Sequence, residues 1–520
     1  MSFNQYRTNP GANVSNFKGR TDTPKAWPST AVSTWMNSAL FGSAGRQGWI
    51  AVLKSGTQDQ AYFGGGAVDS NDDIYCGGRN NGGYTRAIKI SGGDVPAFIA
   101  SSKENTNSDY GDLKSFALVE VDGNLIASGM GSTGLNGYIT SYGPVSTTGD
   151  NTFNPQGARD WTMIGATTNG NNFYMNGHQN LNQIKTAAKN SEFVTFAWTN
   201  KNSSYQPQWG AISLRNYASE AHGFYGDSSS GYVTRSYYYE PLDRYYMSGT
   251  NSSPNAWFLM SSKPTAAHYQ RSRVTYSSSS MTSARRCYWT PSAPVGSDHF
   301  GYLLGFNNTS GHYGVEICKV SAVASSSLDG AVIWSKRLAG PISAAQVSTR
   351  ALTAQPVSDA DGNVYFSFSY YSDSGAGGDS KWHHSISKVS PSGALVWCND
   401  LLFETQNGST DYYANPTQME INSFGDIIVS GRVSTGTGVG NDTRGYVSRL
   451  DGNGGGTGAQ ITMPGGHKVQ YTPNTELGII TSSMVKSTLG SDLNMTNPGN
   501  NSRGQTDSSA TTVTFQSSLL

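Results

Sequence analysis

A hairpin phrase recurs along this chain, and its repetition restricts the fold more than any other feature. Each copy reads as a short strand, a tight polar turn and a second strand rich in β-branched and aromatic residues. The clearest copies span residues 67–78, 118–129, 356–366 and 419–431, and weaker ones span 168–177, 240–249 and 297–305. From the turn at Asp72 to the turn at Gly425 the copies lie about 59 residues apart on average. Because Asp-Gly and Asn-Gly tolerate the positive φ of two-residue turns, each copy predicts an antiparallel hairpin.

A second phrase follows several of these hairpins and supplies further strands. It occurs at residues 85–91, 313–321, 384–390 and 445–452, and two copies continue through a glycine turn into the tryptophan-bearing segments 330–336 and 393–398. Two hairpin strands, a third strand and a tryptophan-bearing fourth strand make an antiparallel meander. The repetition of this unit predicts an all-β protein, a β-propeller of about seven four-stranded antiparallel blades with short N- and C-terminal arms.

The composition excludes several other classes of protein. Charged residues make up 13% of the 520 residues, and 35 Lys and Arg balance 35 Asp and Glu, whereas soluble domains average about 25% charged residues. This balance argues against a partner that presents many phosphates, so no nucleic acid is expected. With 29 Tyr and 11 Trp the chain does not resemble a disordered segment. No run approaches the length of a membrane span, and the N-terminus has no signal-peptide pattern, so we expect synthesis in a cytosol without export.

The fullest repeat carries a resemblance to a known class of protein. From Asp359 to Trp397 the sequence follows the pattern D-x-x-G-N-x-Y … K-v-s-x-x-G-x-x-x-W, which resembles the β-propeller repeat of bacterial and bacteriophage proteins. The resemblance covers roughly residues 48–463, and the turns are degraded in the third to fifth blades. The whole chain is similar to tailed-phage virion proteins that hold a propeller between two arms. The resemblance implies the fold and says little about chemistry.

The flanks divide the chain into three expected parts: an N-terminal anchoring arm at 1–47, the propeller at 48–463, and a C-terminal segment at 464–520. In the first flank, Ser29 or Thr30 is expected to cap a short helix that ends at Gly42. This arm either binds a neighbouring protein or packs on the propeller itself. Its candidate partner-binding residues are Trp27, Trp35, Met36 and Phe41. The C-terminal segment is expected either to complete a blade and close the ring or to pair with another subunit.

Residues that suggest metal chemistry have simpler interpretations in this sequence. The runs Asp69–Asp73 and Asp359–Asn363 resemble calcium loops, but Asx side chains at tight turns commonly bond to their own backbone. His383 and His384 form the one adjacent histidine pair, and on a strand their rings would face opposite sides. The four cysteines lack CxxC spacing, and we expect them to be free and buried. The sequence therefore predicts no metal site, no cofactor and no catalytic residue.

Pairs of tyrosines give the strongest surface signal. Along a strand one member of each pair faces the neighbouring sheet, while the other faces solvent and suits contact with a sugar or a protein. The candidate surface residues are Tyr238, Tyr246, Tyr371 and Tyr413. The alternative interpretation is that these rings pack between blades.

These observations lead to two functional hypotheses. The first is a non-enzymatic structural component of a tailed-phage virion, located in the virion after assembly in the host cytoplasm. Its expected partners are other virion proteins, further copies of itself in a symmetric assembly, and a host surface glycan. The alternative is a propeller that binds or degrades polysaccharide, which would be favoured by carboxylates about 5–10 Å apart at the central funnel.

Overall fold

The computed structural model describes the strands and turns between residues 33 and 487, with gaps in the connecting segments, and one further strand at 513–516. Within these residues the structure is almost entirely strand. Two three-residue 3-10 turns, η2 (Glu240–Leu242) and η3 (Ser374–Ala376), are the helical elements of the described part. The prediction of an all-β chain is thereby confirmed. No helix among the described residues has the length and apolarity to span a membrane.

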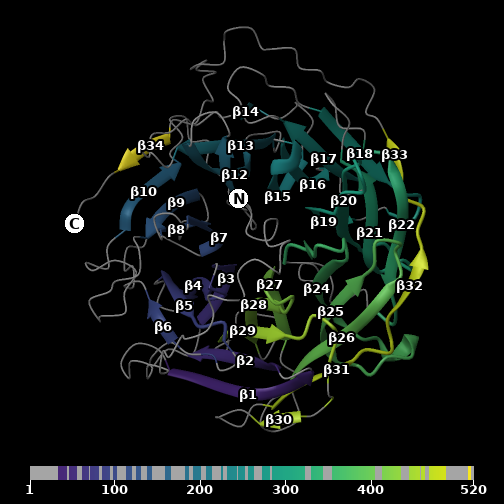
Figure 1. Ribbon diagram of the computed structural model, residues 1–520. Coiled ribbons are helices and arrows are strands. Elements are labelled where there is room, and N and C mark those ends of the chain that lie inside the picture. The colour runs from purple at the N-terminus through teal and green to yellow at the C-terminus, as the bar shows by residue number, and fades with distance from the viewer. Residues whose placement is uncertain are drawn as a thin grey trace.

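In the described part of the chain the strands form seven antiparallel sheets, numbered here by the chain order of their first strands (Figure 1). Sheet 1 contains β3 (Ala61–Val68), β4 (Ile74–Asn80), β5 (Thr85–Ile90) and β6 (Phe98–Ser101). Sheet 2 contains β7 (Leu113–Val119), β8 (Asn124–Met130), β9 (Gly137–Tyr142), β10 (Arg159–Gly165) and β34 (Val513–Gln516). Sheet 3 contains β11 (Asn182–Thr186), β12 (Ser191–Asn200), β13 (Gln206–Ser213) and β14 (Phe224–Tyr225).

Strands from the two flanks also join the remaining four sheets, as β34 joins sheet 2. Sheet 4 contains β15 (Gly231–Tyr239), β16 (Arg244–Asn251), β17 (Trp257–Ser262), β18 (Ser272–Ser277) and β33 (Val485–Ser487). Sheet 5 contains β19 (Ala284–Pro291), β20 (Phe300–Asn307), β21 (Gly314–Ser321), β22 (Val332–Ala339) and β32 (Gly478–Thr481). Sheet 6 contains β23 (Val357–Ser358), β24 (Val364–Tyr371), β25 (Trp382–Val389), β26 (Leu395–Glu404), β31 (Lys468–Pro473) and β30 (Gln460–Thr462). Sheet 7 contains β27 (Tyr413–Ile421), β28 (Ile427–Ser434), β29 (Arg444–Leu450), β2 (Arg46–Lys54) and β1 (Ser33–Ser43).

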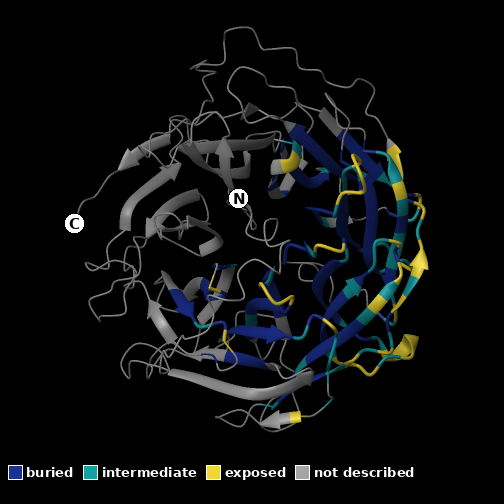
Figure 2. Ribbon diagram, in the orientation of Figure 1, coloured by how far each residue is buried: buried dark blue, intermediate teal, exposed yellow. Residues whose placement is uncertain are grey.

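The sheets lie around a common centre in chain order (Figure 1). The first strand of each sheet contacts the preceding sheet, and β3 of sheet 1 contacts β27, β28 and β29 of sheet 7. This arrangement is that of a propeller-like fold. Sheets 4 to 6 bury both faces of their inner strands, whereas residues on the rim are more exposed (Figure 2).

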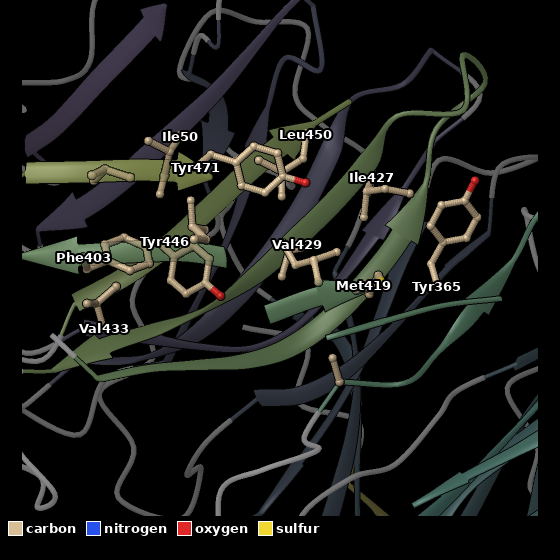
Figure 3. Packing of buried hydrophobic residues seen from close by; sticks show 14 of the residues in the cluster. Ile50, Tyr365, Phe403, Met419, Ile427, Val429, Val433, Tyr446, Leu450 and Tyr471 are labelled. Atoms are coloured by element: carbon tan, nitrogen blue, oxygen red, sulfur yellow. The ribbon is translucent and has the colours of Figure 1, made fainter. Parts of the chain in front are cut away.

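Apolar side chains from neighbouring sheets form the core. Between sheets 6 and 7, Tyr365 and Phe403 on one side face Met419, Val429 and Tyr446 on the other (Figure 3). Because side chains alternate between the two faces of a strand, each inner strand packs alternate residues against one neighbouring sheet and the remainder against the other. The four cysteines are free and buried in these layers, as predicted.

The predicted turns occupy equivalent places in sheets 1, 6 and 7 of the described part of the chain. Asp72, Gly362 and Gly425 all lie in the connection between the first and second strands of a sheet. The predicted turn residues Gly123 and Asp243 lie outside the described residues. Gly362 and Gly425 adopt positive φ, and Asp72 takes the same left-handed conformation with φ 64°. The predicted turn at Gly170 lies outside the described residues. Sheet 3 places its first connection instead between Thr186 and Ser191.

The N-terminal flank differs from the prediction. The expected helix is wrong, because Ser33–Ser43 forms strand β1, which pairs antiparallel with β2. Strand β2 in turn pairs with β29 and takes the fourth position in sheet 7. Trp49, Ile50 and Ala51 of β2 are fully buried there. Sheet 7 therefore combines strands from both ends of the repeat region, and the part of the N-terminal flank in β1 pairs within it.

The C-terminal flank runs along the rim. We call residues 468–487 the C-terminal strap, because β31, β32 and β33 add outer strands to sheets 6, 5 and 4 in that order (Figure 1). The more distant β34 pairs with β10 in sheet 2. Of the two interpretations of this flank, the structure shows pairing within the same chain. The position that completes sheet 7 is filled by β2 instead.

The lysine and the tryptophan of the repeated K…W pattern lie opposite each other on neighbouring strands, and the tryptophan contacts the next sheet. On the third strands of sheets 5 and 6, Lys319 and Lys388 lie directly opposite Trp334 and Trp397 on the fourth strands. The indole Nε1 of Trp334 donates to the Pro391 carbonyl of sheet 6 at 2.9 Å. Trp397 donates in the same way to Gly452 of sheet 7 at 3.2 Å.

The same contact joins sheet 7 to sheet 1. Trp49 lies opposite Arg449, and its Nε1 donates to the Gly93 carbonyl of sheet 1 at 2.9 Å. Arg449 also donates to the Gly92 carbonyl at 3.1 Å. A second link comes from Asp72, whose Oδ1 accepts from the Ser423 backbone N–H at 2.8 Å. Equivalent contacts thus connect sheets 5, 6, 7 and 1.

We expect Trp397→Phe to lower the free energy of unfolding by about 1–2 kcal/mol, because the Gly452 carbonyl loses its donor and the turn loses part of the ring that covers it. The matched control is Trp382→Phe, which removes an indole whose ring lies against Tyr371 of its own sheet. Melting temperatures of the two variants measure the difference. Equal losses in both would show that the contact between sheets has no special role.

Candidate functional site

Turn carboxylates are the first group of residues to consider as a site. Asp359 Oδ1 accepts from the Asn363 backbone N–H at 2.8 Å, and its Oδ2 accepts from the Tyr365 hydroxyl at 2.9 Å. In sheet 1, Asp69 Oδ1 accepts from the Asp73 N–H at 2.9 Å, and Lys89 Nζ lies 2.9 Å from Asp69 Oδ2. These oxygens are occupied by the protein's own donors. The interpretation of both runs as structural turns therefore agrees with the geometry.

A buried polar cluster at the end of sheet 6 has a different character. It lies where β25, β26 and the C-terminal strap meet, and its centre is His383, whose side chain is 6% exposed. The imidazole Nδ1 lies 2.7 Å from Asp400 Oδ2, and Nε2 lies 2.9 Å from Asp379 Oδ1. One face of the ring stacks on Tyr370 with centroids 4.9 Å apart. The ring is thus fixed in both position and orientation.

Asn474 of the strap completes the inner side of this cluster. Its Nδ2 donates to both carboxylate oxygens of Asp400 at 2.9 Å, and lies 2.8 Å from the Tyr370 hydroxyl. Ser385 Oγ also donates to Asp400 Oδ1. The Asn474 Oδ1 accepts from the backbone N–H groups of Glu476 and Leu477 at 2.9 and 3.0 Å. In the sequence Asp400, Ser385 and Tyr370 lie 74 to 104 positions before Asn474, and only the pairing of β31 with β26 brings them together.

Charge in the cluster is set by opposing effects on His383. Burial lowers the pKa of His383, but the hydrogen bonds and charges of Asp400 and Asp379 outweigh it and raise that pKa from 6.5 to about 9. Burial likewise raises the pKa of Asp379, but the hydrogen bond and charge of His383 prevail and lower it. The imidazole is held as a cation between two carboxylates when no other cation is bound.

His384 points to the other side of β25, as strand geometry predicts. Its Nδ1 lies 3.1 Å from the Tyr446 hydroxyl of sheet 7. The side chain is 1% exposed, and burial lowers its pKa to about 3. The two adjacent histidines therefore face different neighbours and cannot share one ion. At neutral pH His383 is a cation and His384 is neutral.

Of the tyrosines predicted to be surface contacts, one is buried and one is half-buried. Tyr246 is 1% exposed and stacks on Trp289 with centroids 4.2 Å apart, so its assignment as a surface residue is wrong. This ring fills the space between sheets 4 and 5, which is the alternative weighed for the tyrosine pairs. Tyr371 is half-buried and meets Trp382 edge to face at 5.7 Å, while its neighbour Tyr370 is fully buried. The alternation expected of a tyrosine pair is thus present at Tyr370 and Tyr371.

Other predicted contact residues have described backbones only, or none. Trp35, Met36 and Phe41 lie on β1, with Trp35 opposite Val52 of β2 and Phe41 opposite Gly48. Tyr238 lies on β15 opposite Tyr245, and Tyr413 begins β27 opposite Ser434. Their side chains, and all of Trp27, lie outside the described residues.

Comparisons with known proteins add little to this geometry. No protein-family model matches the chain, and a search of curated proteins found no match. Among solved structures the chain is similar to Drosophila semaphorin 1b, extracellular domains 1–2, at 8% sequence identity and a TM-score of 0.33. That match covers 76% of this chain and 87% of the other. A likeness of this degree does not bear on function.

We expect acid to weaken the native state through His384. The unfolded imidazole has a pKa of about 6.5, whereas burial holds the folded value near 3. Stability is therefore fully present above pH 6.5 and falls by about 1.4 kcal/mol per pH unit below it, until the folded group titrates. His384→Gln keeps a polar partner for Tyr446 and cannot titrate. Melting temperatures at pH 7 and pH 5 should fall less in the variant than in the parent, and equal falls would refute this assignment.

Proposed function

We propose that this chain is a non-enzymatic structural component of a tailed-phage virion, built as a closed propeller in which each of the seven sheets is one blade. In this proposal β2 closes the ring by completing the last blade. The observation that carries it is the C-terminal strap, which adds outer strands to sheets 4, 5 and 6 and connects them along the rim. Such strands along the rim would hold neighbouring sheets together, and a subunit of a particle needs this because it must keep its shape under mechanical load.

The fourth strands of sheets 5 and 6 and the C-terminal strap also suit contact with neighbouring subunits. Ile333 and Val396 stand immediately before Trp334 and Trp397 on the fourth strands and are 51% and 52% exposed. Ile480 and Val485 on the strap are likewise exposed. Exposed β-branched residues on strands of low charge favour association with another protein surface. We propose that neighbouring virion proteins bind along this rim.

Three aspartates at the turns support a role without catalysis. Asp69, Asp359 and Asp426 are each bonded to a turn or to a basic side chain, at distances of 2.8–2.9 Å. A glycosidase needs one carboxylic acid and one carboxylate facing a substrate. Groups that are already bonded within the fold are poor candidates for that work.

The decisive experiment locates the protein in particles. Antibodies raised against the recombinant chain should label purified tailed-phage particles at a fixed position by immunogold microscopy, and mass spectrometry of those particles should detect it in constant copy number. Val485→Glu, placed on the exposed rim, should leave the fold and melting temperature unchanged and reduce incorporation at least several-fold. Val295→Glu, at an exposed turn of sheet 5, is the matched control. Absence of the chain from washed particles would refute the proposal.

One observation favours glycan binding as a second candidate. Tyr371 and Trp382 form a half-buried edge-to-face pair on sheet 6, and aromatic rings of this kind bind the apolar face of sugars. We expect Tyr371→Ala to weaken binding to a host-surface polysaccharide at least ten-fold in a pull-down, with Phe424→Ala, at the exposed turn of sheet 7, as the control. Equal retention by parent and both variants would remove this candidate.

A further inference from the structure

Three ligand-bearing side chains converge at the outer end of sheet 6 from three separate segments. Asp379 belongs to the connection before β25, His383 to β25 itself, and Glu476 to the strap between β31 and β32. One nitrogen or oxygen atom from each lies within 4.8 Å of the others. A small inward adjustment of the two carboxylates would bring all three to coordination distance of one ion.

The surroundings of His383 match those of a metal-binding histidine. Such a histidine almost always donates its second ring N–H to a carboxylate, a backbone carbonyl or a water, which fixes the ring and directs the other nitrogen to the ion. Here Asp400 Oδ2 lies 2.7 Å from Nδ1, and Asp400 is itself held by Asn474 and Ser385. Nε2 is thereby directed toward Asp379. This supporting shell is an observation separate from the convergence of the three ligands.

Glu476 is oriented in a similar way. Ser372 Oγ donates to Glu476 Oε2 at 2.9 Å, and the same hydroxyl accepts from the Asp379 backbone N–H at 3.1 Å. Ser372 is fully buried, so both acidic ligands are placed by one fixed group. The Asp379 side chain is 41% exposed, whereas His383 is 6% exposed. An ion would therefore enter from the solvent side at Asp379 and meet a buried, prearranged imidazole.

We propose that Asp379, His383 and Glu476 bind one divalent transition-metal ion, with Asp400 as the outer partner of the histidine. One imidazole and two carboxylates suit Zn²⁺ and related ions better than Ca²⁺ or Mg²⁺, which prefer oxygen ligands alone. Water completes the fourth position of a tetrahedral site. Binding releases the proton shared by His383 Nε2 and Asp379, and the ion takes its place.

The site would connect the strap to the sheet it covers. Glu476 belongs to the strap, while the other two ligands lie about 95 residues earlier in the chain. An ion bound by all three would therefore close a long loop. An ion that binds the folded arrangement and not the unfolded chain stabilises the fold in proportion to its affinity. Binding should therefore suppress local opening of the strap before it affects more distant sheets.

The test uses the full chain, treated with EDTA and then freed of it. Titration with ZnCl₂ in a calorimeter should give one ion per chain at this site and raise the melting temperature. Glu476→Gln and Asp379→Asn each remove one ligand charge and should weaken binding at least about ten-fold, and Asp400→Asn should weaken it by about 10–100-fold. Asp361→Asn, an exposed acid in the turn of sheet 6, is the matched control and should bind as the parent does.

Hydrogen exchange shows where in the chain the ion acts, which the calorimetric titration does not. Zn²⁺ should slow exchange in the strap, residues 468–487, of the parent protein and leave exchange in the Glu476→Gln strap unchanged. Circular dichroism and the melting temperature without metal establish that each variant is folded. The proposal is overturned if the parent binds no Zn²⁺, if all the variants bind it like the parent, or if Ca²⁺ or Mg²⁺ at equal concentration displaces it.

Discussion

One contact recurs at three junctions between sheets, from sheet 5 to 6, from 6 to 7 and from 7 to 1: the hydrogen bond from an indole on one sheet to a turn carbonyl on the next. Apolar packing between sheets is strong but has no direction, so by itself it permits sliding. The bonds from Trp334 to Pro391, Trp397 to Gly452 and Trp49 to Gly93 define how one sheet lies on the next. Each requires a close approach of backbone to ring, and a side chain at Gly454 would collide with Trp397. Tryptophan on one sheet and glycine on its neighbour thus depend on each other.

Much of this arrangement could be predicted from the sequence because its signals are local. The Asp-x-x-Gly-Asn turn at Asp359, the lysine at position 388 and the tryptophan at position 397 each specify a strand, a turn or a strand order within one repeat. The position of Gly425 in an equivalent turn follows from the same pattern. Sheet 3 shows the limit of this approach, since its first turn, between Thr186 and Ser191, has no Asp-Gly or Asn-Gly sequence.

The parts that were not predicted depend on residues that are distant in the chain. The segment Ser33–Ser43 has apolar residues compatible with a short helix, and only the neighbouring strand β2 makes it a strand. The cluster around His383 was missed for the same reason. Pattern alone correctly separated His383 from His384, yet Asp400, Asn474 and Glu476 join His383 only through the strap. Tyr246 shows the converse error, because its pattern suits a surface strand but its ring fills a space between sheets.

The pairing of β2 with β29 also determines when this protein finishes folding. Trp49 and Arg449 lie opposite each other although 400 positions separate them in the chain. During synthesis β2 leaves the ribosome early, and the edge that pairs with β29 stays without its partner until nearly the whole repeat region has been made. Pairing at such a separation slows folding far more than it weakens the final state. Pairing with β1 covers only the opposite edge of β2. The nascent chain therefore carries an open strand edge for most of its synthesis, and a shielding factor would protect that edge from association in the interval.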